Sequence, residues 1–184
     1  MKHILHCNRL RFLSVLAVLF LTAPSTVYAE GTGELQVRMD AQVVYCDASL
    51  HKDEKDFVHF LKDGIPVTTV WKIKVSKLRE YWLNKKIAEI VVAHRVVPDL
   101  LTRSWMLVDE ASGISRRVYI AADVYRFLSR LENLSVLDRS LLLEQTPYRM
   151  SVSVVIENGE MNDAWWGGLW ESADIELNAE FNLP

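Results

Sequence analysis

The sequence predicts an α+β domain in which a mainly antiparallel β-sheet carries two amphipathic helices. Several long segments alternate apolar and polar residues, which is the period-two pattern of half-buried strands. Two shorter segments have apolar residues three and four positions apart, as amphipathic helices do. The strands follow one another without regular strand–helix–strand alternation, which favours antiparallel neighbours over parallel crossovers. A β-sandwich with the helices at one end is the alternative.

The first 29 residues have the pattern of a secretory signal peptide. Lys2, Arg9 and Arg11 precede an unbroken apolar run over residues 12–21, and residues 27–29 (Val-Tyr-Ala) supply a cleavage site. The run is too short to span a bilayer as a permanent anchor. We therefore expect cleavage after residue 29 and export of the remainder, with an uncleaved N-terminal anchor as the alternative.

Cleavage leaves residues 30–184, which have the length of a single α+β domain. Loss of the three basic residues lowers the net charge from −3 to −6. A mildly acidic domain argues against a nucleic-acid partner and against binding to anionic lipid by charge alone. Cys46 is the one cysteine left, so an internal disulfide is excluded. No later apolar run is long enough to form a transmembrane segment.

The first half of the domain is expected to contain a strand, a helix and a long second strand. Residues 35–45 alternate cleanly and predict the first strand. Asp53 is placed to cap the following helix, Gly64 to end it in a left-handed conformation, and Pro66 to prevent its continuation. The apolar face of this helix comprises Phe57, Phe60, Leu61 and Ile65. Residues 67–75 then alternate and predict a strand with one buried and one mostly solvated face.

The second half continues with strands around one further helix. A charged, aromatic connection over residues 78–86, which includes Tyr81 and Trp82, leads to strands at 87–97 and 100–108. The spacing of apolar residues predicts the second helix over 121–133. Strands are expected at 150–156 and at 174–181, where acidic outer positions suit an edge strand.

Four blocks of the sequence carry a resemblance to a known family. They are LKDGIPVTTVWKIKV, the basic and tryptophan-containing stretch 77–85, LLTRSWMLVDEASG and YRMSVSV. In this order they resemble a family of exported, mostly proteobacterial proteins known only as a domain of unknown function, from Leu35 to the C-terminus. The resemblance implies one compact domain in the periplasm or cell envelope of a Gram-negative bacterium. It implies no catalytic residues, because the family has no assigned activity.

One cluster of residue types could support metal or thiol chemistry. Cys46, His51 and His59 lie close in sequence, with Asp47 and Asp53 nearby, and such side chains bind transition metals or activate a thiolate. Their spacing lacks the close ligand pairs of zinc sites, so a packed cysteine and two solvated histidines are expected instead. His94 has no accompanying nucleophile motif, and the chain has no glycine-rich phosphate loop. We expect neither a cofactor nor a bound metal.

The candidate binding residues are Trp165, Trp166 and Trp170. Three indoles within six residues, hinged by two glycines, are typical of aromatic anchors for a protein partner, a glycan or a membrane interface. The alternative is a loop that folds back and closes the core. Basic residues also concentrate between positions 72 and 86, where they form a solvated sheet face or meet an anionic envelope polymer: Lys72, Lys74, Lys77, Arg79, Lys85 and Lys86.

The functional hypothesis is a non-catalytic, exported module that binds a protein partner or an envelope polymer. The alternative is a small periplasmic enzyme or metal-binding protein that uses Cys46, His51 and His59.

Overall fold

The fold is built around β3 (Val67–Lys77), which pairs along its whole length with β4 (Lys85–Asp99) on one side and β8 (Pro147–Asn158) on the other. The computed structural model describes residues 33–159 and 175–183. The described helices and strands all belong to one compact unit.

The strands form two antiparallel sheets. The six-stranded sheet has the order β6-β5-β4-β3-β8-β9 and the three-stranded sheet the order β1-β2-β7. The other strands are β1 (Gly33–Met39), β2 (Val43–Leu50), β5 (Ser104–Asp109), β6 (Ile114–Val118), β7 (Arg130–Asp138) and β9 (Ile175–Asn182). The helices are α1 (Glu54–Lys62), α2 (Ala121–Ser129) and the 3-10 helix η1 (Arg139–Leu141). The predicted α+β class, with mainly antiparallel sheets and two α-helices, is confirmed, whereas the sandwich alternative stays a prediction.

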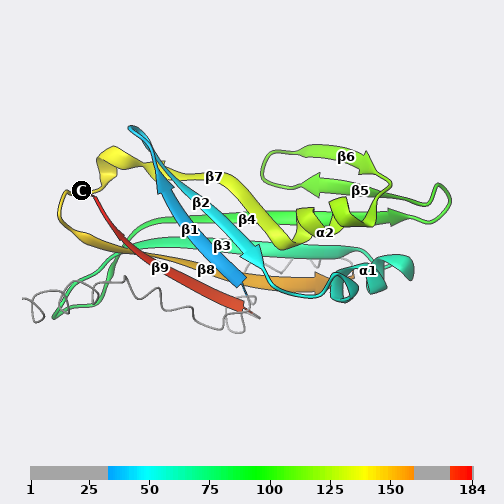
Figure 1. Cartoon of the computed structure of the whole chain (residues 1–184), viewed down its shortest axis with the longest axis horizontal. Helices are drawn as coiled ribbons and strands as arrows, with labels where there is room; N and C mark the ends of the chain where they lie inside the picture. The colour runs from blue at the N-terminus through cyan, green and yellow to red at the C-terminus, as the bar shows by residue number, and fades with distance from the viewer. Residues whose placement is uncertain (1–32, 160–174, 184) are drawn as a thin grey trace, which may run out of the picture. The chain divides into compact units, whose positions relative to one another are not determined.

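The two α-helices pack together on one face of the six-stranded sheet (Figure 1). Phe57 of α1 meets Tyr125 of α2 edge to face, with ring centroids 5.8 Å apart. The Tyr125 hydroxyl donates a hydrogen bond to the Lys52 carbonyl oxygen at 2.8 Å. The three-stranded sheet crosses the long strands beside the helices, and the hydrophobic core takes residues from both sheets and both helices. Trp71, at the centre of β3, is fully buried in this core.

The second face of β3 differs from the prediction of a mostly solvated face. Val70 and Thr68 on that face are fully buried, although Lys74 is exposed. In the register of the sheet, Ala93 and Val155 lie on either side of Val70. Alternation indicates which residues share a face, but it does not distinguish a central strand from an edge strand.

The strand predicted over residues 35–45 is wrong, because the chain turns back within it. Asp40 follows the last residue of β1, and its Oδ1 accepts hydrogen bonds from the backbone N–H of Gln42 at 2.8 Å and of Val43 at 2.7 Å. Tyr45 also donates from its hydroxyl to Asp40 Oδ2 at 3.0 Å. An aspartate that binds the backbone two and three residues ahead makes a turn without glycine or proline, so the alternation passes through the turn unbroken.

The second helix is shorter than the predicted range 121–133. It ends at Ser129, and Arg130 is already extended, with φ −134° and ψ 144°. Residues 130–138 form β7, which pairs with β2. Asn133 has φ 55°, and its backbone N–H donates to Asp47 Oδ1 at 2.7 Å. The apolar spacing of a helix continues to residue 133, but pairing with β2 makes residues 130–138 a strand instead.

The first helix agrees with the prediction at its C-terminus and differs at its N-terminus. Gly64 has φ 81°, and Ile65 and Gly64 donate to the carbonyl oxygens of Phe60 and Leu61 at 3.0 and 3.3 Å. These two bonds form a Schellman cap. Asp53 occupies the N-cap position, but its side chain makes no capping hydrogen bond. Within the described residues, no helix is long and apolar enough to cross a membrane.

Candidate functional site

Cys46, one of the three residues of the hypothetical metal site, belongs to the core. It lies in β2 and is fully buried. Burial raises the pKa of its thiol to about 12, and the charge of Asp47 contributes a smaller part. Because the thiolate is the form that attacks electrophiles and binds metals, this cysteine is held in its unreactive state.

The two histidines of that hypothetical site are exposed and face different carboxylates. His51 Nε2 lies 3.6 Å from Glu34 Oε1, and His59 Nε2 lies 3.9 Å from Asp63 Oδ2. In the part of the chain that the structure describes, no group of three or more histidine, cysteine, aspartate or glutamate side chains is placed to hold a metal ion. The structure thus does not bring Cys46, His51 and His59 together.

His94 is a buried residue of β4 that contacts α2. Its Nδ1 lies 2.8 Å from the Phe127 carbonyl oxygen, and its ring stacks on the Phe127 ring with centroids 4.3 Å apart. The Phe127 carbonyl is in the last turn of α2, where backbone acceptors lack helical partners. Burial lowers the pKa of His94, and the bond to Phe127 and the charge of Asp109 oppose this change only in part. A neutral imidazole with its Nδ1–H directed at a carbonyl caps the helix.

Trp165, Trp166 and Trp170 lie outside the described residues. The hypothesis that they bind a partner stays a prediction.

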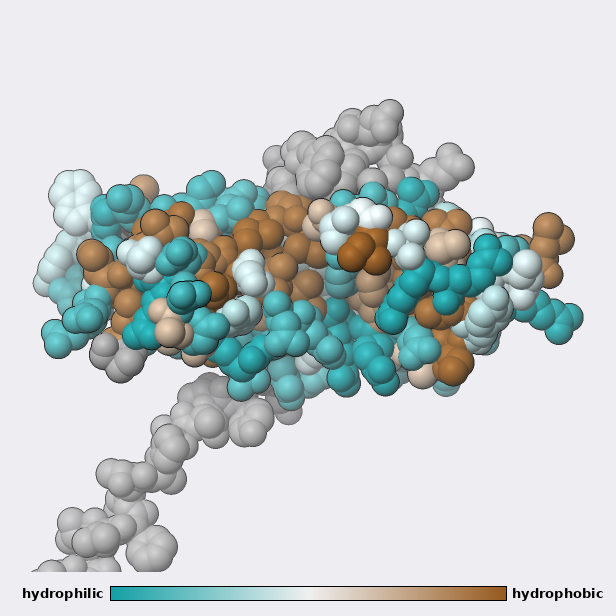
Figure 2. Space-filling view, turned by 90° about the horizontal axis from the view of Figure 1, so that it is seen from above, coloured by the Kyte–Doolittle hydropathy of each residue, from teal (hydrophilic) through white to brown (hydrophobic). Residues whose placement is uncertain are grey.

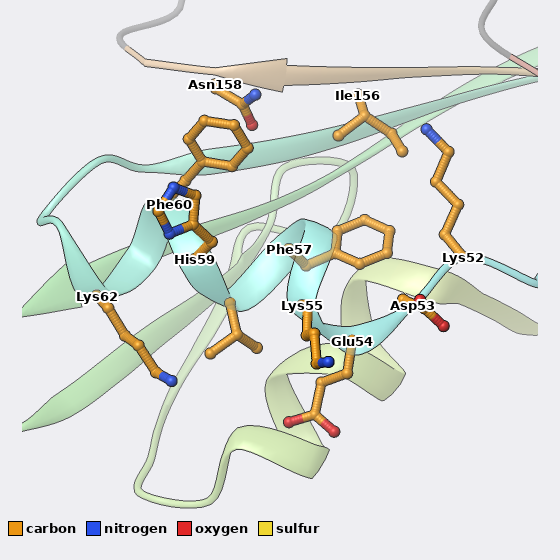
Figure 3. Close-up of a pocket in the computed structure, with 11 residues that line it drawn as sticks. Lys52, Asp53, Glu54, Lys55, Phe57, His59, Phe60, Lys62, Ile156 and Asn158 are labelled. Carbon is orange, nitrogen blue, oxygen red and sulfur yellow. The ribbon is translucent and has the colours of Figure 1, made fainter.

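A groove runs along α1 beside the end of β8 (Figure 3). Its volume is about 1210 Å³. The rings of Phe57 and Phe60 point toward the β8 segment that carries Ile156 and Asn158. The charged lining residues carry both signs: Lys52, Lys55 and Lys62 with Asp53 and Glu54. The lining thus combines two aromatic rings with charges of both signs.

The most exposed aromatic group of the described chain is at the tip of the β3–β4 hairpin. Tyr81 is 88% exposed, Trp82 79% and Leu83 92%. At the base of the tip, Leu78 donates from its backbone N–H to the Pro147 carbonyl oxygen at 3.0 Å. Figure 2 shows pale and brown side chains among hydrophilic ones at the left end, where this hairpin ends in Figure 1. Large apolar side chains that project together mark an interaction surface more often than isolated ones do.

Five of the six basic residues predicted as one concentration fall into two groups, and the sixth, Lys74, is exposed opposite Glu89 in the register of β3 and β4. Lys72 and Lys86 lie 3.5 and 3.0 Å from the carboxylate of Glu89, whose pKa is lowered first by the hydrogen bond from Lys86. The second group flanks the hairpin tip. Lys77 and Lys85 are direct cross-strand partners, an arrangement of like charges that destabilises a sheet.

No carboxylate compensates this second group within the described residues. The ion pairs there include none to Lys77, Arg79 or Lys85, although Glu80 lies within the tip. The hairpin from Lys77 to Lys86 carries four basic residues and one acidic residue, in a chain of net charge −3. It is therefore a basic and aromatic projection on an acidic domain.

The sequence predicted a charged, aromatic connection here and singled out its basic residues, but not Tyr81, Trp82 and Leu83 as an exposed group. The position of these residues indicates an exposed group, because Tyr81, Trp82 and Leu83 are consecutive and fall between two strands that pair with each other. A residue at the turn of a long hairpin has no sheet to pack on, so apolar residues there are exposed. The exposure of these residues depends on the pairing of β3 with β4, which the alternation of residues does not specify.

Comparison with other proteins places the chain in a family. No curated protein and no solved structure matches it. The family model described as "Domain of unknown function (DUF4390)" matches residues 32–161, a range that includes the hairpin and all strands from β1 to β8. The match ends before the C-terminus to which the resemblance was expected to extend. The chain belongs to this family of domains of unknown function.

Proposed function

We propose that the protein is an exported, non-catalytic module of the Gram-negative cell envelope, and that its β3–β4 hairpin binds an anionic envelope component. The observation that carries this proposal is the cross-strand pair Lys77 and Lys85, which makes no ion pair among the described residues and stands beside an exposed aromatic tip. Two cations held opposite each other repel, and an anionic partner would relieve this repulsion on binding. The position of Cys46 in the core gives no support to the alternative of a metal-binding protein or enzyme.

Export is supported by the N-terminal pattern of basic residues, short apolar run and cleavage site. Mass spectrometry of the protein purified from whole cells should give Glu30 as its first residue. Recovery of the intact chain from a membrane fraction would replace cleavage with the anchor alternative.

Binding is tested by co-sedimentation of the purified protein with an envelope fraction. We expect the double variant Arg79→Glu, Lys85→Glu to lose most of the binding. The matched control is Lys55→Glu, Lys62→Glu, which changes the net charge equally at two exposed positions of α1. Binding of the wild type should also weaken as salt rises, because exposed charges are screened. Equal loss in the two double variants would show that net charge, and not the hairpin, determines binding.

A further inference from the structure

We infer that the anionic component is a phospholipid bilayer and that the tip formed by Tyr81, Trp82 and Leu83 inserts into its interface. This inference rests on the proposed function and names the partner of the same hairpin.

The side chains of the tip have the chemistry of residues at a membrane interface. Tyrosine and tryptophan combine an apolar ring with one polar group, and they concentrate at the level of the lipid headgroups. Leu83 follows them directly and is 92% exposed. A soluble anionic polymer offers this leucine no apolar contact, whereas the acyl-chain boundary of a bilayer does. The leucine therefore favours a bilayer over a polymer.

Basic residues stand on both sides of the tip. Arg79 and Lys85 each stand two residues from the aromatic and leucine residues of the tip. An extended chain advances about 3.3–3.6 Å per residue, so both cations lie within about 7 Å of the tip along the chain. Their long side chains reach the headgroup phosphates while the rings lie deeper. Charge and apolar surface are thus arranged in the order that an anionic bilayer presents them.

The tip is small and convex compared with a stable protein interface. A stable protein interface buries about 800 Å² on each partner. Tyrosine and tryptophan each bury about 150–250 Å², so a tip of three side chains offers less than such an interface requires. A hairpin tip is convex, and a fluid bilayer can enclose a convex group on all sides. A single tip of this size gives reversible attachment, as one lipid chain does.

The experiment measures co-sedimentation of the protein, purified after expression of the full chain, with two kinds of vesicle. One contains phosphatidylglycerol and phosphatidylethanolamine, and the other contains phosphatidylcholine alone. We expect binding to the anionic vesicles only. Neutralising the cations in Arg79→Gln, Lys85→Gln should weaken binding about 25-fold, since each basic residue near an anionic surface contributes about fivefold, or ~1 kcal/mol. Trp82→Ala should weaken it at least tenfold.

Matched controls separate the tip from general hydrophobicity. Leu101 is 97% exposed in the β4–β5 turn, at the other end of β4, and Tyr119 is an exposed aromatic residue beyond β6. Leu101→Ala and Tyr119→Ala should bind as the wild type does. Quenching of fluorescence by lipids brominated in the acyl chains should occur in the wild type and decrease in Trp82→Phe, which reports the depth of that ring.

The outcomes distinguish this inference from the function on which it rests. Binding to the envelope fraction but to neither vesicle would overturn the bilayer inference and leave the proposed function standing. Binding to neither the fraction nor the vesicles would overturn both. Vesicle binding unchanged in Trp82→Ala, or equal binding to phosphatidylcholine, would also overturn the inference. A dimer in analytical ultracentrifugation that Trp82→Ala abolishes, without vesicle binding, would assign the tip to a second copy of the chain instead.

Discussion

Replacement of Gly64 by alanine tests the structural reasoning at the end of α1. Gly64 has φ 81°, where a side chain on an L-residue crowds the following carbonyl oxygen at a cost of roughly 1–2 kcal/mol. A Cβ at this position would also lie 3.1 Å from Leu100 Cδ1. Leu100 is mostly exposed, so its side chain can turn away. The contact should therefore add little, and we expect a total loss of about 1–2 kcal/mol in the free energy of unfolding.

Gly113 provides the matched control. It has φ 68°, and a Cβ there would have no heavy atom within 4 Å. Gly113→Ala thus carries the backbone cost without the contact, and the two variants should lose similar stability. Equilibrium urea denaturation measures both, with an unchanged m-value as the sign that only stability has changed.

Two results would refute this reasoning. Gly64→Ala as stable as the wild type would mean that the chain leaves α1 without a left-handed residue. The stability lost in Gly64→Ala could also be much larger than in Gly113→Ala and be recovered when Leu100→Ala is added. The contact with Leu100, and not the backbone strain, would then cause most of the loss. Gly64→Val should cost about 1–3 kcal/mol, because a β-branched residue is more strained at this position.

Three further predictions concern the residues singled out above. Because burial holds the pKa of His94 below its usual 6.5, the unfolded chain takes up a proton first as pH falls. The free energy of unfolding should decrease as pH falls through 6.5, with a weaker dependence in His94→Gln than in the exposed-site control His59→Gln, as measured by denaturation at a series of pH values. Cys46 should resist iodoacetamide at pH 8 and react once the protein is denatured, because burial raises the pKa of its thiol to about 12. Mass spectrometry measures the modification. Modification of the native protein would contradict the position of Cys46 in the core. If the Trp165–Trp170 loop binds a partner, Trp166→Ala should cost about 2 kcal/mol or more of affinity with little change in stability, whereas a loss of about 3–5 kcal/mol in stability would show that the loop closes the core.

The sequence by itself determined the features that depend on neighbouring residues. The alternation over residues 67–75 predicted the strand β3, and the three-to-four spacing predicted α1. Gly64 followed by Pro66 marked the end of α1, because few other residues adopt the left-handed conformation of a helix cap. These patterns are local, so they can be recognised without knowing which segments pair. The family resemblance likewise rested on contiguous blocks, and a family model matches residues 32–161.

The tertiary structure decided everything that depends on which segments pair. The division of residues 35–45 into β1 and β2 follows from hydrogen bonds to Asp40, and the strand after Ser129 follows from pairing with β2. Val70 is buried between Ala93 and Val155 of the neighbouring strands, and the pKa of Cys46 is raised because its face of β2 packs in the core. The hairpin tip is an exposed surface because β3 pairs with β4 and the turn between them carries Trp82 beyond the sheet. Whether a side chain is buried depends on the segments that fold against it. A repeat of two or of three to four residues does not identify those segments.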